Sequence, residues 1–119
     1  RIAEIGHQLK QLHPFQGALS ASDVIVSDEY TGAGYGVVGE MERESIHLLA
    51  SLEGVLLDPV YTGRAMGGLI DMIRRGVIAP SETILFWHTG GTPALFSYAD
   101  KLNIASGLYD NRADGDLPE

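Results

Sequence analysis

The chain has 119 residues, of which 45% are hydrophobic and 20% are charged, a composition that suffices for one packed domain or a part of one. Sixteen acidic residues against eight Lys and Arg give a formal net charge of −8, which argues against nucleic acid and anionic membranes as partners, because both require a basic surface. Cysteine is absent, which excludes disulfides and thiolate metal sites, and the four scattered histidines show no metal-ligand spacing, so no metal site is expected.

The sequence carries no targeting signal that we recognise. No apolar run approaches the roughly 20 residues that span a bilayer. The amino-terminal residues lack the apolar stretch of a signal peptide, and Arg1 stands where an initiator Met would. We therefore expect a cytoplasmic protein, and a chain that begins inside a longer one.

Apolar residues recur at helical spacing in three segments, 2–12, 41–52 and about 63–75. Gly54 and Gly76 are expected to end the second and third helices. The second helix is expected to turn four charged side chains toward solvent: Glu40, Glu42, Arg43 and Glu44. Each of the three segments therefore predicts an amphipathic helix.

Three short apolar segments between these helices, 23–27, 55–57 and 83–87, predict buried strands. A last helix is predicted to follow them, with Thr92 as its N-cap and Pro93 at its first position. Strands that alternate with helices imply a parallel sheet. The predicted fold class is therefore α/β, a partial three-layer arrangement of about three parallel strands with helices on both faces.

Two parts of the chain differ in composition. Residues 1–102 contain all the predicted elements, whereas residues 103–119 are acidic and lack apolar periodicity, so they are expected to form a flexible tail. Three strands are few for a parallel sheet, which typically has about five or six. We therefore expect residues 1–102 to be part of a larger domain.

The segments that follow the three predicted strands are rich in glycine and hydroxyl groups. They read "DEYTGAGYG" (28–36), "DPVYT" (58–62) and "HTGGT" (88–92). Ligands of open parallel sheets bind beyond the carboxyl ends of the strands, so these segments are expected to share one edge. The hydroxyl-bearing residues there are Tyr30, Tyr35, Tyr61, Thr62, Thr89 and Thr92.

Simpler roles are open to several of these residues. Thr62 is in the position of an N-cap, and Asp58 before a proline is typical of a turn rather than of a general base. Gly67 and Gly68 inside a helix each cost about 1 kcal/mol relative to alanine, which close packing of that helix on a sheet would explain. These alternatives stay open at this point.

Two stretches, "EGVLLDPVYTGRAMGGLID" (53–71) and "HTGGTPALF" (88–96), carry a specific resemblance. The sequence from about residue 20 to 100 resembles the C-terminal part of the D-cysteine desulfhydrase and 1-aminocyclopropane-1-carboxylate deaminase family. These are pyridoxal-phosphate enzymes of the tryptophan synthase β type. The resemblance implies that the chain is the C-terminal portion of a large, cofactor-binding domain.

The resemblance also implies roles for individual residues. Tyr35 and Tyr61 match two tyrosines that line the substrate pocket of the family, where they orient the substrate or exchange a proton with it. Thr89 matches the hydroxyl residue that faces the pyridine nitrogen of the cofactor. Gly90 and Gly91 let the backbone pass close to the ring.

Thr62 separates the two branches of the family and counts among the cofactor-binding residues. The ring-opening deaminases carry Glu at this position, and a carboxylate beside the ring nitrogen would keep it protonated. A threonine supplies no such charge, so "YT" together with "HTGG" favours β-elimination. The resemblance thus implies a lyase that converts D-cysteine, or a related D-amino acid, to pyruvate, ammonia and sulfide.

The family's Schiff-base lysine precedes the region matched here, and neither Lys10 nor Lys101 aligns with it. The chain alone is therefore expected to be inactive, and to need the missing N-terminal half of the enzyme. Association with another chain, as a dimer or other homo-oligomer, is also expected because covering strands would be absent. Two alternatives remain open: a truncated, non-catalytic interaction module, and a 1-aminocyclopropane-1-carboxylate deaminase.

Overall fold

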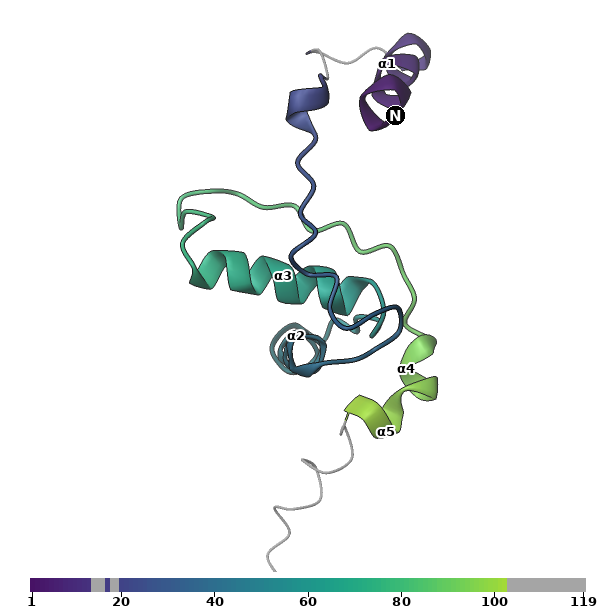
Figure 1. The fold of residues 1–119 in the computed structure, drawn as a ribbon, viewed down its shortest axis with the longest axis vertical. Helices are drawn as coiled ribbons and strands as arrows, with labels where there is room; N and C mark the ends of the chain where they lie inside the picture. The colour runs from purple at the N-terminus through teal and green to yellow at the C-terminus, as the bar shows by residue number, and fades with distance from the viewer. Residues whose placement is uncertain (14–16, 18–19, 103–119) are drawn as a thin grey trace, which may run out of the picture.

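The computed structural model of the chain describes residues 1–13, 17 and 20–102, so the predicted acidic tail, 103–119, lies outside the described residues. Helices are the regular elements of the described part, joined by long irregular segments (Figure 1). In chain order they are α1 (Ile2–Leu12), the 3-10 helix η1 (Ala21–Asp23), α2 (Glu40–Glu53), α3 (Thr62–Arg74), α4 (Ala94–Ser97) and α5 (Ala99–Leu102).

The three helices predicted from apolar spacing are present, with ends within one or two residues of the prediction. Gly54 follows α2 with φ 66°, and Gly76 follows α3 with φ 72°. Both angles lie in the left-handed region, which glycine enters without the steric cost that a Cβ atom imposes. The stop signals read from the sequence are therefore the ones that the structure uses.

The last predicted helix differs from the structure. It is divided into α4 and α5, which are interrupted at Tyr98. Pro93, not Thr92, is the residue that precedes α4. The hydroxyl of Thr92 instead donates a hydrogen bond to the carbonyl of Leu56, 3.2 Å away, so a contact with a distant segment replaces the local cap.

The predicted parallel sheet is not formed in the described part of the chain, where no residue is assigned to a strand. Segments 23–27, 55–57 and 83–87 run without a hydrogen-bonded ladder between them. Ile25 and Leu85, which were predicted to be buried, are 90% and 81% exposed. A strand requires backbone partners on a neighbouring strand, and an apolar segment without such a partner does not form one.

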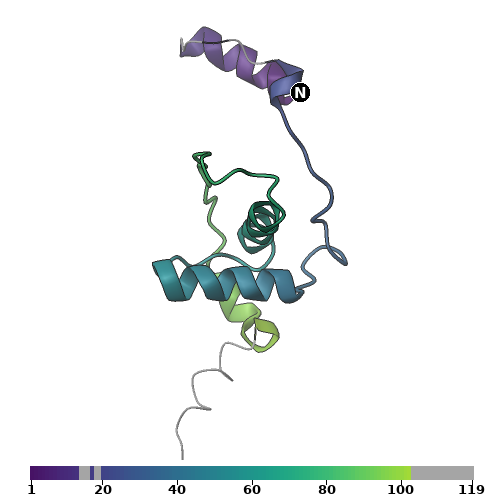
Figure 2. The same cartoon turned by 90° about the vertical axis from the view of Figure 1, so that its left-hand side faces the viewer.

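The core of the described chain lies between α2 and α3. Figure 1 looks along α2 while α3 runs across the view, and Figure 2 shows the reverse, so the two helices cross steeply. Two glycines of α3 allow the close approach. A Cβ atom on Gly67 would lie 2.5 Å from Cγ of Met41, and one on Gly63 would lie 2.9 Å from the Ile46 side chain. Of the two glycines predicted to pack on a sheet, Gly67 thus packs on helix α2, and Gly68 packs on the ring of Tyr30.

The buried apolar side chains of the described residues come from α2, α3, α5 and the segment between α2 and α3: Ile46, Leu57, Met66 and Leu102. The helix α1 has no buried residue and lies apart from the α2–α3 pair in both views (Figures 1 and 2).

None of the helices in the described ranges combines the length and the apolar character that a bilayer crossing requires.

Candidate active site

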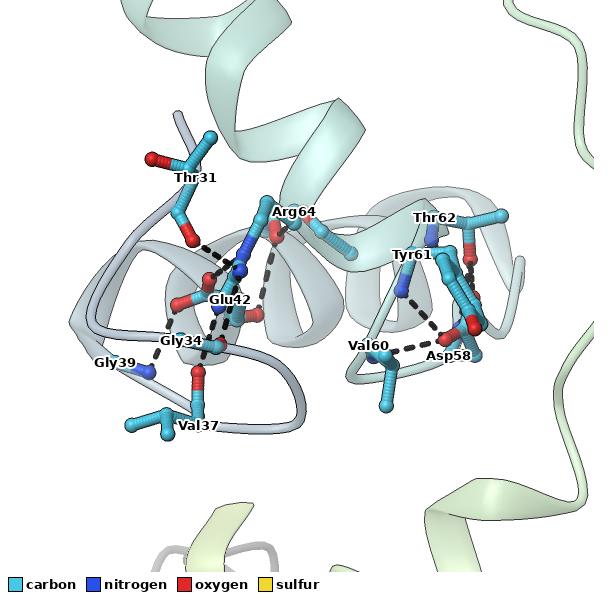
Figure 3. A network of polar contacts seen from close by, with 12 residues as sticks. Thr31, Gly34, Val37, Gly39, Glu42, Asp58, Val60, Tyr61, Thr62 and Arg64 are labelled. Atoms are coloured by element: carbon cyan, nitrogen blue, oxygen red, sulfur yellow. Dashed lines mark hydrogen bonds and ion pairs between the residues drawn. The ribbon is translucent and has the colours of Figure 1, made fainter. Parts of the chain in front are cut away.

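A buried carboxylate, Asp58, organises the turn from segment 55–57 into α3 (Figure 3). Its Oδ1 accepts the N–H groups of Val60 (2.8 Å) and Tyr61 (2.7 Å), and its Oδ2 accepts the N–H of Thr62 (2.7 Å). The hydroxyl of Thr62 donates to Oδ2 at 2.7 Å and accepts the N–H of Asp58 at 2.8 Å. Tyr61, and not Thr62, is therefore the N-cap residue of α3, and the Asp58 carboxylate accepts the N–H groups of Tyr61 and of Thr62, the first residue of the helix.

The charge of Asp58 is stabilised where it lies. Burial raises the pKa of this carboxyl group, but the hydrogen bonds from Thr62, Tyr61 and Val60 outweigh burial, and the net pKa is lowered. A negative charge at a helix N-terminus also interacts favourably with the helix dipole. Turn chemistry, the role predicted for Asp58, is what the structure shows.

This turn presents Tyr61 to Tyr35. Their hydroxyl oxygens are 2.9 Å apart, and the two rings meet edge to face with centroids 6.0 Å apart. Both side chains are exposed, Tyr35 to 80% and Tyr61 to 61%, so the pair is open to a ligand. The hydrogen bond between the Tyr61 and Tyr35 hydroxyls raises the pKa of Tyr61, with smaller contributions from charge and burial, so Tyr61 keeps its proton at neutral pH.

The loop that carries Tyr35 is held by Arg64 of α3 (Figure 3). The Arg64 guanidinium donates to the backbone carbonyls of Thr31, Gly34 (3.3 Å) and Val37 (2.7 Å). Its Nε donates to Oε1 of Glu42 on α2, 2.6 Å away, in an ion pair. One side chain thus joins two helices and the glycine-rich loop.

Glu42 is 3% exposed, which corrects the prediction that it lies on the solvent side of its helix. Burial raises the pKa of Glu42, but the hydrogen bonds from Arg64 and from the N–H of Gly39 outweigh it, and the net pKa is lowered. Sequence reasoning missed both Glu42 and Arg64. The spacing of apolar residues indicates which face of a helix is exposed to solvent. It does not reveal that Glu42 has a charged partner, Arg64, 22 residues away.

A cavity of about 550 Å³ lies beside the tyrosine pair. Residues from the glycine-rich loop and from one side of α3 line it, among them Tyr30, Tyr35, Tyr61, Arg64 and Met72. Tyr30 lies against Gly68, where an added Cβ atom would be 3.0 Å from the ring, and its hydroxyl donates to Asp71 at 2.8 Å. The cavity therefore has hydroxyl groups at its rim and apolar contacts along α3.

The "HTGGT" segment lies beside the end of segment 55–57. His88 is within 3.0 Å of the Leu56 carbonyl through Nε2, and its Nδ1 accepts the N–H of Gly90 at 3.0 Å. Because Nδ1 accepts, Nε2 carries the proton and donates to Leu56. Gly91 lies against Asp58, where a Cβ atom would be 2.8 Å from the side chain.

The structure brings some of the predicted site residues together and leaves others apart. Tyr35 and Tyr61 are hydrogen-bonded to each other, and Thr62 is buried beneath them with its hydroxyl bonded to Asp58. Thr89 is exposed, forms no hydrogen bond within the described residues and does not line the cavity. Within those same residues, no group of His, Cys, Asp or Glu is arranged to hold a metal ion.

The chain is similar in structure and in sequence to known proteins of one family. A solved structure described as an ACC deaminase homologue superimposes with a TM-score of 0.57 and 42% sequence identity, covering 67% of this chain and 25% of that one. No protein-family model matches the chain.

The sequence relatives are more specific. D-cysteine desulfhydrases of Salmonella newport (strain SL254) and Salmonella heidelberg (strain SL476) are each 54% identical to the chain over 91 residues. The match covers 76% of this chain and 28% of each relative, so the chain spans little more than a quarter of the length of these proteins. Together the matches confirm the resemblance to the D-cysteine desulfhydrase and 1-aminocyclopropane-1-carboxylate deaminase family.

Proposed function

We propose that the chain supplies the substrate-facing part of a pyridoxal-phosphate-dependent lyase. In the proposed reaction, D-cysteine or a related D-amino acid undergoes β-elimination, and for D-cysteine the products after hydrolysis are pyruvate, ammonia and hydrogen sulfide. The observation that carries this proposal is the Tyr35–Tyr61 hydroxyl pair at the rim of the cavity, in a sequence that is 54% identical to D-cysteine desulfhydrases.

The two tyrosines have complementary roles in this proposal. Tyr61 keeps its proton at neutral pH, so its hydroxyl can donate a hydrogen bond to the substrate, or a proton to the departing sulfur. Tyr35 is hydrogen-bonded to Tyr61 and fixes the orientation of its hydroxyl. Both groups lie on turns that are held by buried charges, which is the kind of support that a positioned proton donor needs.

The cofactor side of the proposed site is the 88–92 segment. Thr89 would face the pyridine nitrogen, and Gly90 and Gly91, with φ of 101° and 92°, hold the turn that presents it. When bound, pyridoxal phosphate stabilises the negative charge that develops on the substrate α-carbon. Thr62 is proposed to act at this site by holding Asp58, since its hydroxyl is already hydrogen-bonded there.

The chain offers threonine hydroxyl groups to the cofactor but no lysine at the cavity that could form the Schiff base with it. Neither lysine of the chain lines the cavity: Lys10 is on α1, and the Lys101 ammonium lies 5.1 Å from the centroid of the Tyr98 ring. We propose that the anchoring lysine comes from the part of the enzyme that corresponds to the uncovered length of the relatives. A homo-oligomer is proposed for the complete protein.

The experiment exchanges matched segments. The 91 matched residues of the Salmonella newport desulfhydrase are replaced by the corresponding residues of this chain. We expect the chimera to release sulfide from D-cysteine, and Tyr61→Phe to reduce kcat about 100-fold or more, because a positioned proton donor contributes about 10²–10⁴. The exposed variant Arg74→Lys is the matched control and should leave the rate unchanged.

The ACC deaminase homologue among the structural relatives makes ring opening of 1-aminocyclopropane-1-carboxylate the second candidate activity. The same chimera discriminates the two, since ring opening yields 2-oxobutanoate and no sulfide. A folded, cofactor-loaded chimera that makes 2-oxobutanoate faster than it releases sulfide would overturn the desulfhydrase assignment. A chimera that binds the cofactor but performs neither reaction would favour a non-catalytic module.

A further inference from the structure

Arg64 forms four polar contacts with segments that lie far from it in the sequence. Its guanidinium is bonded to one carboxylate oxygen of Glu42 and to three backbone carbonyls of the loop between residues 31 and 37. The Glu42 partner is buried and is itself held by the N–H of Gly39 at 2.8 Å. The contact therefore ties the glycine-rich loop to two helices through a charge pair that is shielded from water.

The loop that Arg64 holds has one backbone hydrogen bond of its own, from the N–H of Val37 to the carbonyl of Gly34 at 3.3 Å. Gly32, Gly34 and Gly36 have φ of 64°, 144° and 69°, a backbone course that residues with a Cβ atom rarely adopt. A Cβ atom on Gly32 would lie 2.9 Å from Nη2 of Arg64, so the guanidinium packs directly on the backbone. Tyr35 stands in the middle of this loop, between two of its glycines.

Arg64 also lies two residues after Thr62, in the first turn of α3, whose capping turn presents Tyr61. One end of α3 therefore holds the Asp58 turn that bears Tyr61 and, through the guanidinium, the loop that bears Tyr35. Figure 3 shows the contacts of Asp58 and of Arg64. We propose that Arg64 is a positioning residue, which fixes loop 31–37 on α3 so that the Tyr35 hydroxyl meets the Tyr61 hydroxyl. The catalytic meaning of this inference rests on the proposed function, whereas its geometry does not.

The contact requires a guanidinium in particular. Its planar fork reaches three carbonyls and a carboxylate at once, whereas the ammonium of lysine is a compact, strongly hydrated charge at the end of a flexible stem. Arg64→Lys therefore keeps the charge and most of the stem but loses the simultaneous contacts. Arg74→Lys is a matched control, because Arg74 is on the same helix and pairs with Glu44 in an exposed ion pair.

The test is the titration of Tyr61 in the full 119-residue chain, followed through the NMR resonance of its ring carbon bearing the hydroxyl. In Arg64→Lys the upward shift of the Tyr61 pKa should be lost, as in Tyr35→Phe, because each change removes the hydrogen bond between the hydroxyls. Combining the two substitutions should add nothing further. Arg74→Lys should titrate like the parent chain.

An unchanged Tyr61 titration in a folded Arg64→Lys chain overturns the inference. A second measurement needs no variant: separate resonances for the Arg64 Nη–H hydrogens support a fixed guanidinium, and one averaged resonance overturns the inference. In the sulfide-releasing chimera, Arg64→Lys should lower kcat about 10- to 100-fold with KM within about twofold. If the unsubstituted chimera releases no sulfide, the proposed function fails while the Tyr61 result still decides the role of Arg64.

Discussion

At the scale of single residues, Asp58 is the side chain on which the candidate site depends most. It accepts three backbone N–H groups and one hydroxyl proton, and it is 1% exposed. A buried acceptor with four donors is fully satisfied, so removing its charge leaves donors without a partner. The role of the "DPVYT" segment is thus to fix the place of one tyrosine through one aspartate.

Asp58→Asn tests this role. The substituted amide keeps one oxygen for Val60 and Tyr61, but its NH₂ group would face the N–H and hydroxyl of Thr62, which are donors. We expect the free energy of unfolding to fall by about 1–3 kcal/mol in urea titrations. Asp100→Asn, at an exposed position of α5, is the control and should change it by less than about 0.5 kcal/mol.

The same variant has a consequence for acid stability. The folded-state pKa of Asp58 is lowered, so its stabilisation is complete above the unfolded value of about 3.9 and is lost as the pH falls through the lower folded value. The parent chain should therefore lose stability over that interval, and Asp58→Asn should lose less. Equal acid sensitivity of the two chains would contradict this account.

At the scale of elements, local signals predicted the helices well. The apolar spacing lies within the helices α1, α2 and α3, and Gly54 and Gly76 lie just after α2 and α3. The local sequence alone therefore indicates where these helices form and where α2 and α3 end. Contacts between distant segments were not predictable in this way. Arg64 was missed because its partners are carbonyls about 30 residues earlier, and Glu42 was misplaced because its partner is on another helix.

The packing of α2 on α3 gives a prediction in which two effects have opposite signs. In an isolated helix, Gly67→Ala would stabilise by about 1 kcal/mol. Here the added methyl group would overlap Met41, and the Met41 carbonyl oxygen would lie 3.2 Å from it, so we expect a net loss of about 1–3 kcal/mol. Thermal unfolding of Gly67→Ala, Met41→Ala and the double variant measures this loss of stability. The double variant should lose less than the sum of the two single losses, because Met41→Ala makes room for the added methyl group. Strictly additive losses would show that they do not touch.

At the scale of the whole molecule, the strands are where sequence and structure differ. Segments 23–27, 55–57 and 83–87 have the composition of strands, yet in the described residues they form no sheet. Pairing is a property of two segments and of what covers them, which the composition of one segment does not determine. The ends of the second and third segments nevertheless lie side by side, joined by His88 and Thr92 to the carbonyl of Leu56.

The contact between Tyr35 and Tyr61 could not have been predicted from sequence patterns. The roles of Tyr35 and Tyr61 came from matched motifs, because no spacing rule brings residues 26 apart in the sequence into contact. The structure then places their hydroxyls 2.9 Å apart. The roles of Tyr35, Tyr61 and Thr89 all stay predictions, and the segment that carries Thr89 lies beside the Asp58 turn but outside the lining of the cavity.

The position of the two lysines leads to a prediction about the chain as a whole. When the 119-residue chain is mixed with pyridoxal phosphate and reduced with borohydride, no stoichiometric adduct should form on Lys10 or Lys101, because neither lines the cavity. The chimera treated in the same way should carry one adduct, on a lysine of the desulfhydrase part. Peptide mass spectrometry reads both results, and a full adduct on Lys101 of the isolated chain would refute the proposed division of the site.

The contact between Gly91 and Asp58 has a mechanical consequence. Because no side chain separates them, the turn that bears Tyr61 and the turn that bears Thr89 cannot slide past each other without dislodging the aspartate. A displacement of the turn that bears Tyr61 would therefore displace the turn that bears Thr89 as well. The proposed substrate side and the proposed cofactor side of the site would then move as one unit.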